Sequence, residues 1–364
     1  MGKKGLNIYH RKDGRWEGRY KDGFKADGKP KYRSVYAKSY GEVKEVLIHI
    51  QNAEMKPKST CSLTVQQIFT EWLSIRKLKV KESTIANYEF KFRKHLLSAF
   101  GNLKFSDISA KMVYDFIHKK LHDGLSGKYI ADMIILLKSI AKYAGRTYYC
   151  ANQIADVELP KAENHEIKPY SREQQAVLTQ ELLKDTDLSK MGILLCAYTG
   201  IRIGELCALQ WKDIDFQNQT LEISKTCQRI RNSGDTATKL VITAPKSRSS
   251  VRMIPIPSFL MKLLKSFAPS DNNAYLLSGC DRIIEPRTVQ YRFQAILRKA
   301  KLPSVNFHSL RHYFATFCIE IGFDVKTLSE ILGHGSVQIT LNRYVHSSMN
   351  RKRECMERIC LNLD

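Results

Sequence analysis

The sequence predicts a multidomain α+β protein with three parts: a small three-stranded β-sheet with a helix, a helical unit, and a mainly helical region that contains a small antiparallel sheet. Three observations support this fold class. The chain has 364 residues, more than one hydrophobic core usually organises. Its hydrophobic pattern changes from a strand-like period of two to a helical period near 3.6. Residues 153–170, with two prolines and few large apolar side chains, separate two regular regions and predict a linker.

The first 58 residues predict three short strands, at 6–10, 15–21 and 31–37, followed by a helix over 40–53. Turn signals at 12–14 and 26–30 separate the strands. This part holds 15 Lys or Arg against 7 Asp or Glu, a net charge of +8. Aromatic side chains interleave with these bases: Tyr9, Trp16, Tyr20, Tyr32 and Tyr36. The pattern indicates a sheet face that lies against DNA phosphates or in a groove; the alternative is a solvated basic surface over a small core.

Residues 62–143 carry apolar side chains at three-to-four spacing, which predicts helices over 65–75, 84–100, 111–121 and 127–144. Thr64, Ser83 or Thr84, and Ser109 are the expected N-caps. These helices should form one compact four-helix unit.

Beyond the linker, a helix is expected over 188–198, with Gly200 in the left-handed cap position, followed by a short helix from Ile203. Strands are expected at 213–216, 220–224, 240–244 and 251–256. The basic turn 245–250 joins the last two strands, so we expect it to be a hairpin turn. The remainder is predicted to be mostly helical.

The composition bounds the class of partner. With 59 Lys plus Arg against 36 Asp plus Glu, the net charge is +23, which indicates a polyanion such as nucleic acid. Acidic lipid headgroups are the rival, but the start of the chain has no apolar signal core and the apolar stretches are too short to span a bilayer. We therefore expect no membrane partner and a cytoplasmic location. The nine scattered cysteines contain no C-x-x-C pair, which disfavours a disulfide framework or a zinc module.

Four motifs stand out by their order and spacing: T-G-I-R-I-G-E-L at 199–206, P-K-S-R-S-S at 245–250, H-S-L-R-H-Y-F-A-T at 308–316, and L-G-H-G-S-V-Q-I-T-L-N-R-Y-V-H at 332–346. Together they resemble the catalytic boxes of tyrosine recombinases, the family of phage and conjugative-element integrases. The resemblance covers essentially the whole chain. It implies an arm-type DNA-binding domain over 1–58, a helical, SAM-like core-binding domain over 59–152, a linker over 153–170, and a catalytic domain with a C-terminal tail over 171–364.

The charged residues of these motifs suit phosphoryl chemistry. The five-coordinate transition state of phosphodiester cleavage concentrates negative charge, which fixed cations must meet. Arginine can hold two phosphate oxygens at once, so Arg202 and Arg311 are the candidate clamps. Taken singly, Arg202 could be a surface arginine at a helix start and Arg311 the partner of an acidic side chain. His308, three residues before Arg311, shares its helical face and could reach the same phosphate.

The resemblance assigns the remaining roles. Tyr344, ten residues after His334, is the nucleophile and forms a 3′-phosphotyrosyl bond that leaves a free 5′-hydroxyl. His308 assists proton transfer to or from Tyr344, and His334 donates a hydrogen bond to a phosphate oxygen. Lys246 is the general acid for the leaving oxygen, although Arg248 on the same turn is a second candidate. Glu205 supports the site, and the reaction needs no ATP, cofactor or metal.

Two local alternatives were weighed. His308 and His312 are four apart on one helical face, as zinc ligands can be, but the motif is not H-E-x-x-H and an arginine lies between them. His312 is therefore expected to be a structural core histidine. Ser309 stands where many relatives carry Asp, at a position outside the reacting set.

The implied function is that of a site-specific recombinase that integrates and excises a mobile element. Its partners would be double-stranded DNA with core and arm attachment sites, a homotetramer on two duplexes, and accessory directionality or DNA-bending proteins, in a bacterial cytoplasm and at the nucleoid when bound. A tail stripe of Met356, Ile359, Cys360 and Leu363 could dock on a neighbouring protomer or pack in cis. The competing functions are a resolvase, a type IB topoisomerase-like strand transferase, and a noncatalytic DNA-binding regulator.

Overall fold

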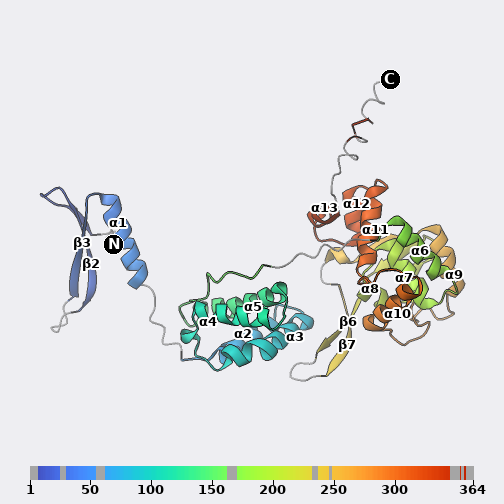
Figure 1. Cartoon of the computed structure of the whole chain (residues 1–364), viewed down its shortest axis with the longest axis horizontal. Helices are drawn as coiled ribbons and strands as arrows, with labels where there is room; N and C mark the ends of the chain where they lie inside the picture. Colours follow the sequence, from blue (N-terminus) through green and yellow to red (C-terminus); the bar gives the residue numbers. More distant parts are fainter. Residues whose placement is uncertain are drawn as a thin grey trace. The chain divides into compact units, whose positions relative to one another are not determined.

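The computed structural model of the chain describes residues 7–24, 30–54, 62–161, 170–231, 237–245 and 248–344, together with Arg353, Met356 and Glu357 (Figure 1). It divides into two compact units, Met1–Glu163 and Asn164–Asp364. Within the described ranges, no helix is both long and apolar enough to cross a bilayer.

The N-terminal part is an antiparallel sheet covered on one face by a helix, as the sequence predicts. Strands β1 (Ile8–His10), β2 (Trp16–Phe24) and β3 (Pro30–Ala37) lie in the order β1-β2-β3, and α1 (Tyr40–Glu54) follows. Gly18 allows the helix to approach β2, because a Cβ there would lie 2.5 Å from Val43 and 2.7 Å from Leu47. Side chains alternate along a strand, so the residues next to Gly18 point to the opposite, open face.

The helical part contains α2 (Val65–Lys77), α3 (Glu82–Lys91), the π-helix η1 (Phe92–Gly101), the short 3₁₀ helix η2 (Phe105–Asp107), α4 (Ala110–His122) and α5 (Gly127–Thr147). Thr64 and Ser109 cap α2 and α4 with their hydroxyls, as predicted. The third predicted cap is wrong: α3 begins after Lys81, so Ser83 and Thr84 lie inside its first turn. The helix expected over 84–100 is α3 continued by η1.

The start of the predicted linker packs on these helices. Ile154 and Val157 are buried in the same hydrophobic cluster as the helical part, and the Lys138 ammonium donates a hydrogen bond to the Ala155 carbonyl at 2.8 Å. Residues 162–169, in the middle of the predicted linker, lie outside the described residues. The domain boundaries stay predictions.

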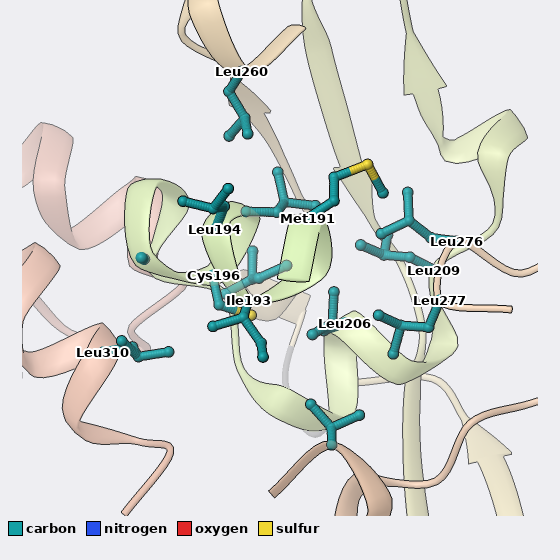
Figure 2. Packing of buried hydrophobic residues seen from close by; sticks show 14 of the residues in the cluster. Met191, Ile193, Leu194, Cys196, Leu206, Leu209, Leu260, Leu276, Leu277 and Leu310 are labelled. Carbon is teal, nitrogen blue, oxygen red and sulfur yellow. The ribbon is translucent and has the colours of Figure 1, made fainter. Parts of the chain in front are cut away.

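The C-terminal unit is mainly helical. Its helices are α6 (Arg172–Leu183), α7 (Leu188–Thr199), α8 (Ile203–Ala208), α9 (Ser258–Phe267), α10 (Pro286–Lys299), α11 (Ser309–Glu320), α12 (Val325–Leu332) and α13 (Val337–Tyr344), with the 3₁₀ turns η3 (Trp211–Asp213) and η4 (Arg248–Ser250). Helix α7 lies at the centre of the core because it is apolar on all sides. Figure 2 shows Leu194 and Ile193 of α7 among Leu206 of α8, Leu260 of α9 and Leu310 of α11.

The strands of this unit form two separate sheets. β4 (Ile214–Asp215), β5 (Thr220–Ile223) and β8 (Arg252–Pro255) form a three-stranded sheet, while β6 (Thr226–Arg231) and β7 (Thr238–Thr243) form a ribbon. The sequence prediction missed β6. The predicted hairpin across 245–250 is therefore wrong, because β7 pairs with β6 and β8 pairs with β5. The turn joins strands of different sheets.

Candidate active site

Arg311 is fixed by the ends of two helices. It is 2% exposed in the first turn of α11, and its Nη1 and Nη2 atoms donate hydrogen bonds to the carbonyls of Gly200 at 2.8 Å and Leu332 at 2.7 Å. These carbonyls lie at the C-terminal ends of α7 and α12, where partial negative charge favours a cation. Burial, and after it the charge of Arg202, lower the pKa of Arg311 to about 9. The guanidinium stays protonated at neutral pH.

Glycines end both of these helices. Gly200 has φ +66° and Gly333 has φ +64°, the left-handed conformation that L side chains rarely adopt. A Cβ at Gly200 would also lie 2.5 Å from the Phe314 ring and 2.8 Å from Leu332. The turns that present the two carbonyls to Arg311 therefore require glycine.

Arg202 lies at the N-terminus of α8 and pairs with Glu205. Its backbone N–H donates to Glu205 Oε2 at 2.9 Å and its Nη1 donates to Glu205 Oε1 at 2.8 Å. The Arg202 side chain is 37% exposed and that of Glu205 only 3%. The buried Glu205 thus orients Arg202, while part of the Arg202 guanidinium remains exposed to solvent.

A pocket of about 350 Å³ brings these cations together with His308. His308 is the N-cap residue of α11 and faces the same space. The pocket is lined by Arg202, His308 and Arg311, by the polar Thr226, Gln290 and Asn306, and by Ile201, Ile203, Gly204 and Phe307. Two arginines and a histidine around one pocket can bind an oxyanion such as a phosphate.

His334, which follows α12, and Tyr344, the last residue of α13, lie beside each other. The His334 Nδ1 atom is 2.8 Å from the Thr340 hydroxyl, which fixes the ring. The rings of His334 and Tyr344 are parallel with centroids 6.3 Å apart. His312 lies 5.6 Å from the Tyr344 ring and 4.7 Å from the His308 ring. His312 is buried, as predicted for a core histidine, and it connects the pocket histidine to the tyrosine.

Tyr344 is 6% exposed and packs in a small cluster with Ala315, Cys318 and Leu328. Its hydroxyl is buried and makes no well-aligned hydrogen bond to a described residue, although the Arg311 guanidinium lies close enough to act on its pKa. Burial raises the pKa of the phenol, and the charges of Arg311, Arg343 and Arg202 oppose that rise. In this state Tyr344 is a protonated phenol at neutral pH.

The three histidines are electrically neutral in the same state. Burial, followed by neighbouring positive charges, lowers the pKa of His308, His312 and His334 to about 4 in each case. A bound phosphate would have the opposite effect, because a nearby negative charge stabilises the imidazolium. Among the described side chains of the free site, the fixed positive charge therefore comes from Arg202, Arg311 and Arg343.

The structure brings together five of the six predicted catalytic residues, and Glu205 with them. Lys246 and the side chain of Arg248 lie outside the part of the chain that the structure describes. In the tail, the predicted apolar stripe lies outside them as well, apart from Met356. Among the residues the structure describes, no group of three His, Cys, Asp or Glu side chains is arranged for a metal ion.

Sequence reasoning missed three residues at this site. Arg252 of β8 also binds the Glu205 carboxylate, with Nη2 2.9 Å from Oε2. Thr340 holds His334, and the charge of Arg343 acts on Tyr344 and on all three histidines. Thr340 and Arg343 fall within the last motif, so their proximity to Tyr344 on one helix was the available signal. Arg252 offered none, because Glu205 is 47 residues away.

The chain is similar to known proteins over most of its length. The profile of the phage integrase family matches residues 172–351, and that of the phage integrase N-terminal SAM-like domain matches residues 64–121. The chain is 28% identical to a tyrosine recombinase XerC-like protein of Caldanaerobacter subterraneus, over 81% of this chain and 82% of that one.

Two solved structures share the fold. The Tn1549 transposon integrase in complex with circular intermediate DNA has a TM-score of 0.66 and 25% identity, covering 82% of this chain and 100% of that chain. The lambda integrase tetramer bound to a Holliday junction has a TM-score of 0.56 and 18% identity, covering 94% of this chain and 97% of that chain. The multidomain α+β fold predicted from the sequence is confirmed. The chain belongs to the phage integrase family, the tyrosine recombinases that break and rejoin DNA.

Proposed function

We propose that the protein is the site-specific recombinase of a mobile DNA element and that Tyr344 is its nucleophile. The observation that carries this proposal is the pocket in which Arg202, Arg311 and His308 meet, with Tyr344 one histidine ring away. The two arginines supply fixed positive charge for a phosphate. The likeness to the Tn1549 transposon integrase supports a mobile element as the source of the DNA.

The reaction is a transesterification. The Tyr344 oxygen forms a bond to phosphorus while the bond from phosphorus to the 5′ oxygen breaks. This step yields a 3′-phosphotyrosyl bond and a 5′-hydroxyl. The phenol proton leaves towards His308, and the 5′ oxygen takes a proton from Lys246. The phosphodiester energy is kept in the new bond, so attack by a 5′-hydroxyl reverses the step without ATP or a cofactor.

The resting state of the site suits an enzyme that acts only on bound DNA. The Tyr344 phenol is protonated and its hydroxyl is buried. A phosphate in the pocket would raise the pKa of His308, which then could accept and return the phenol proton. Cleavage would require this rearrangement and a move of Tyr344 out of its cluster.

The test is the covalent adduct. The full chain is incubated with a nicked DNA duplex, and covalent adducts are resolved on denaturing gels. The duplex spans the junction between the mobile element that carries the gene and the DNA that flanks this element. We expect an adduct with the parent chain and with Tyr275→Phe, a control in the same unit outside the site. Tyr344→Phe should form none. An adduct with Tyr344→Phe would show that another residue is the nucleophile.

Lys246 is proposed as the general acid, with Arg248 as the competing candidate. Lys246→Ala should block cleavage of normal DNA but spare a substrate whose 5′-bridging oxygen is replaced by sulfur, since a thiolate leaves without a proton. Arg248→Ala is the matched control on the same turn. If only Arg248→Ala shows this rescue, the acid is Arg248; equal loss of Lys246→Ala on both substrates rejects its role as acid.

The N-terminal sheet is proposed to bind arm-type DNA sites through its open face. Tyr9, Tyr32 and Tyr36 are 53%, 57% and 50% exposed on that face. Two arginines lie over the Tyr36 ring, with Arg11 5.4 Å and Arg15 5.7 Å from its centroid. Cations over flat rings suit contact with phosphates and bases. Deleting residues 1–58 should abolish binding to distal arm sites and spare core-site binding; unchanged arm-site affinity would reject this assignment.

Assembly and the choice among related activities remain proposals as well. We propose a homotetramer on two duplexes, with accessory proteins that set direction; the lambda integrase, which shares the fold, forms a tetramer bound to a Holliday junction. Recombination between two plasmid-borne sites distinguishes this function from its rivals. A type IB topoisomerase-like enzyme would relax supercoils without exchanging the sites, and a noncatalytic regulator would bind without forming an adduct. A resolvase would recombine without needing residues 1–58.

A further inference from the structure

We propose that Arg252 is a positioning residue that keeps Arg202 positively charged towards the phosphate by neutralising Glu205. This inference rests on the proposed function. In this role, Arg252 acts on the phosphate through Glu205 and Arg202 and makes no contact with the DNA itself.

Arg252 and Glu205 form a buried ion pair. Their side chains are 6% and 3% exposed. The guanidinium donates from Nη2 to Glu205 Oε2 at 2.9 Å and from Nη1 to Oε1 at 3.2 Å. This two-point contact is the geometry in which arginine binds a carboxylate best. Burial alone would raise the pKa of Glu205, but the hydrogen bonds and charge of Arg252, with a smaller contribution from Arg202, lower it.

Backbone contacts hold Arg252 in this place. Its Nε donates to the Ile331 carbonyl at 2.6 Å and its Nη1 to the Ser250 carbonyl at 3.0 Å. A Cβ on Gly333 would lie 3.0 Å from Arg252 Cδ and 3.1 Å from Nη1, so the side chain lies directly against that turn. The guanidinium is thus held against the end of α12, beside Glu205.

The charges explain why a second arginine is needed. Glu205 accepts two hydrogen bonds from Arg202 and so orients it. Without a further cation, the negative charge of the carboxylate would cancel the positive charge of Arg202 and weaken its attraction for a phosphate. With Arg252 included, the three side chains carry a net charge of one positive. In a buried site such charges interact more strongly than in water. Arg202 can then be oriented by a carboxylate and still attract a phosphate.

The experiment compares Arg252→Met, Glu205→Gln and the double variant in the full chain. Each is measured on the nicked junction duplex for the affinity of DNA and for the single-turnover rate of adduct formation. A second substrate carries a methylphosphonate at the cleaved position, which has no negative charge. Arg172→Met is the matched control, because Arg172 forms an exposed ion pair with Glu320 at 2.9 Å outside the site.

On the normal phosphodiester, Arg252→Met should slow adduct formation by roughly 100-fold, the loss typical for one electrostatic contact at a reacting centre. DNA affinity should change by less than about threefold, because most contacts to the DNA backbone are elsewhere. On the methylphosphonate, the loss should shrink to below about tenfold, since the reacting group carries one negative charge fewer. Arg172→Met should match the parent on both substrates.

The double variant separates this role from a purely structural one. Glu205→Gln removes the charge that Arg252 neutralises, so Glu205→Gln/Arg252→Met should cleave within about threefold of Glu205→Gln alone. Removing both charges also leaves no buried ion unpaired, which keeps the double variant testable if Arg252→Met fails to fold. A double variant more than tenfold slower than Glu205→Gln, or an equal loss for Arg252→Met on both substrates, would overturn the proposal. A parent chain without a Tyr344-dependent adduct would instead refute the proposed function, and this role with it.

Discussion

Replacing Gly200 by Ala tests whether the left-handed backbone and the close packing at the end of α7 require glycine. Two effects oppose a side chain there. The left-handed conformation costs a non-glycine residue about 1–2 kcal/mol, and Gly200 has φ +66°. The new methyl would also lie 2.5 Å from Phe314 and 2.8 Å from Leu332, and such overpacking costs about 1–3 kcal/mol. We therefore expect a loss of roughly 2–5 kcal/mol in the free energy of unfolding.

Gly322→Ala is the matched control in the same unit. Gly322 also has a positive φ, +96°, but nothing lies within 4 Å of a Cβ built on it. It should lose only the conformational part, about 1–2 kcal/mol.

Unfolding of the full chain in urea can be followed through thiol labelling of Cys196 and Cys207. Both are buried, on α7 and α8, so they report on this region. Equal losses for Gly200→Ala and Gly322→Ala would refute the argument from close packing. Because the Gly200 carbonyl accepts a hydrogen bond from Arg311, adduct formation should also fall for Gly200→Ala and not for the control.

Three further predictions concern protons and hydrogen bonds. The pKa of His312 is about 4 in the folded chain, below its unfolded value, so the unfolded chain binds more protons between these two values and the free energy of unfolding falls as the pH drops through this window. Replacing His312 by Gln should remove about 2 kcal/mol of the fall in the free energy of unfolding between pH 7 and 5, as measured by urea denaturation. If the pH dependence of stability were unchanged in His312→Gln, this prediction would be wrong. Thr340→Val should slow adduct formation with DNA affinity retained, because the His334 ring loses its 2.8 Å partner; a parent-like rate would show that the ring needs no such support. Glu17 accepts hydrogen bonds from Arg11 at 2.8 Å and from Arg19 at 2.9 Å, so Glu17→Gln should loosen the two arginines that it orients and weaken arm-site binding in gel-shift assays, while core-site binding stays unchanged; stronger arm-site binding would show that the lost negative charge outweighs the lost orientation, and equal weakening at both sites would argue against a local role.

Features encoded by nearby residues could be predicted from the sequence. Helix α7 ends at the glycine that the sequence marks as its cap, and the three N-terminal strands lie where turn residues separate them. The four-residue spacing of His308 and His312 predicts that they share one face of a helix, and their rings lie 4.7 Å apart at the start of α11. Each of these outcomes depends on residues within a few positions of one another.

Features that depend on distant partners could not be predicted. The strand β6 has the mostly polar sequence T-C-Q-R-I-R, and only its pairing with β7 and the burial of Cys227 and Ile230 make it a strand. Arg252 meets a carbonyl 79 residues away, so no local pattern distinguishes it from Arg248 of the preceding basic turn. The motif identifies Tyr344 but not its burial, because conformation at a helix end depends on the neighbouring helices.

Arg311 has a consequence for how this enzyme can change over evolutionary time. At many binding sites the functional side chain is a source of strain, so removing it yields a sturdier but inactive protein. Here the same guanidinium that faces the pocket also satisfies the carbonyls at two helix ends, which are 111 and 21 residues away in the chain. A variant without it would leave both acceptors unpaired in the interior. Copies that lose Arg311 should therefore misfold and be degraded, rather than persist as intact DNA-binding competitors of the parent protein.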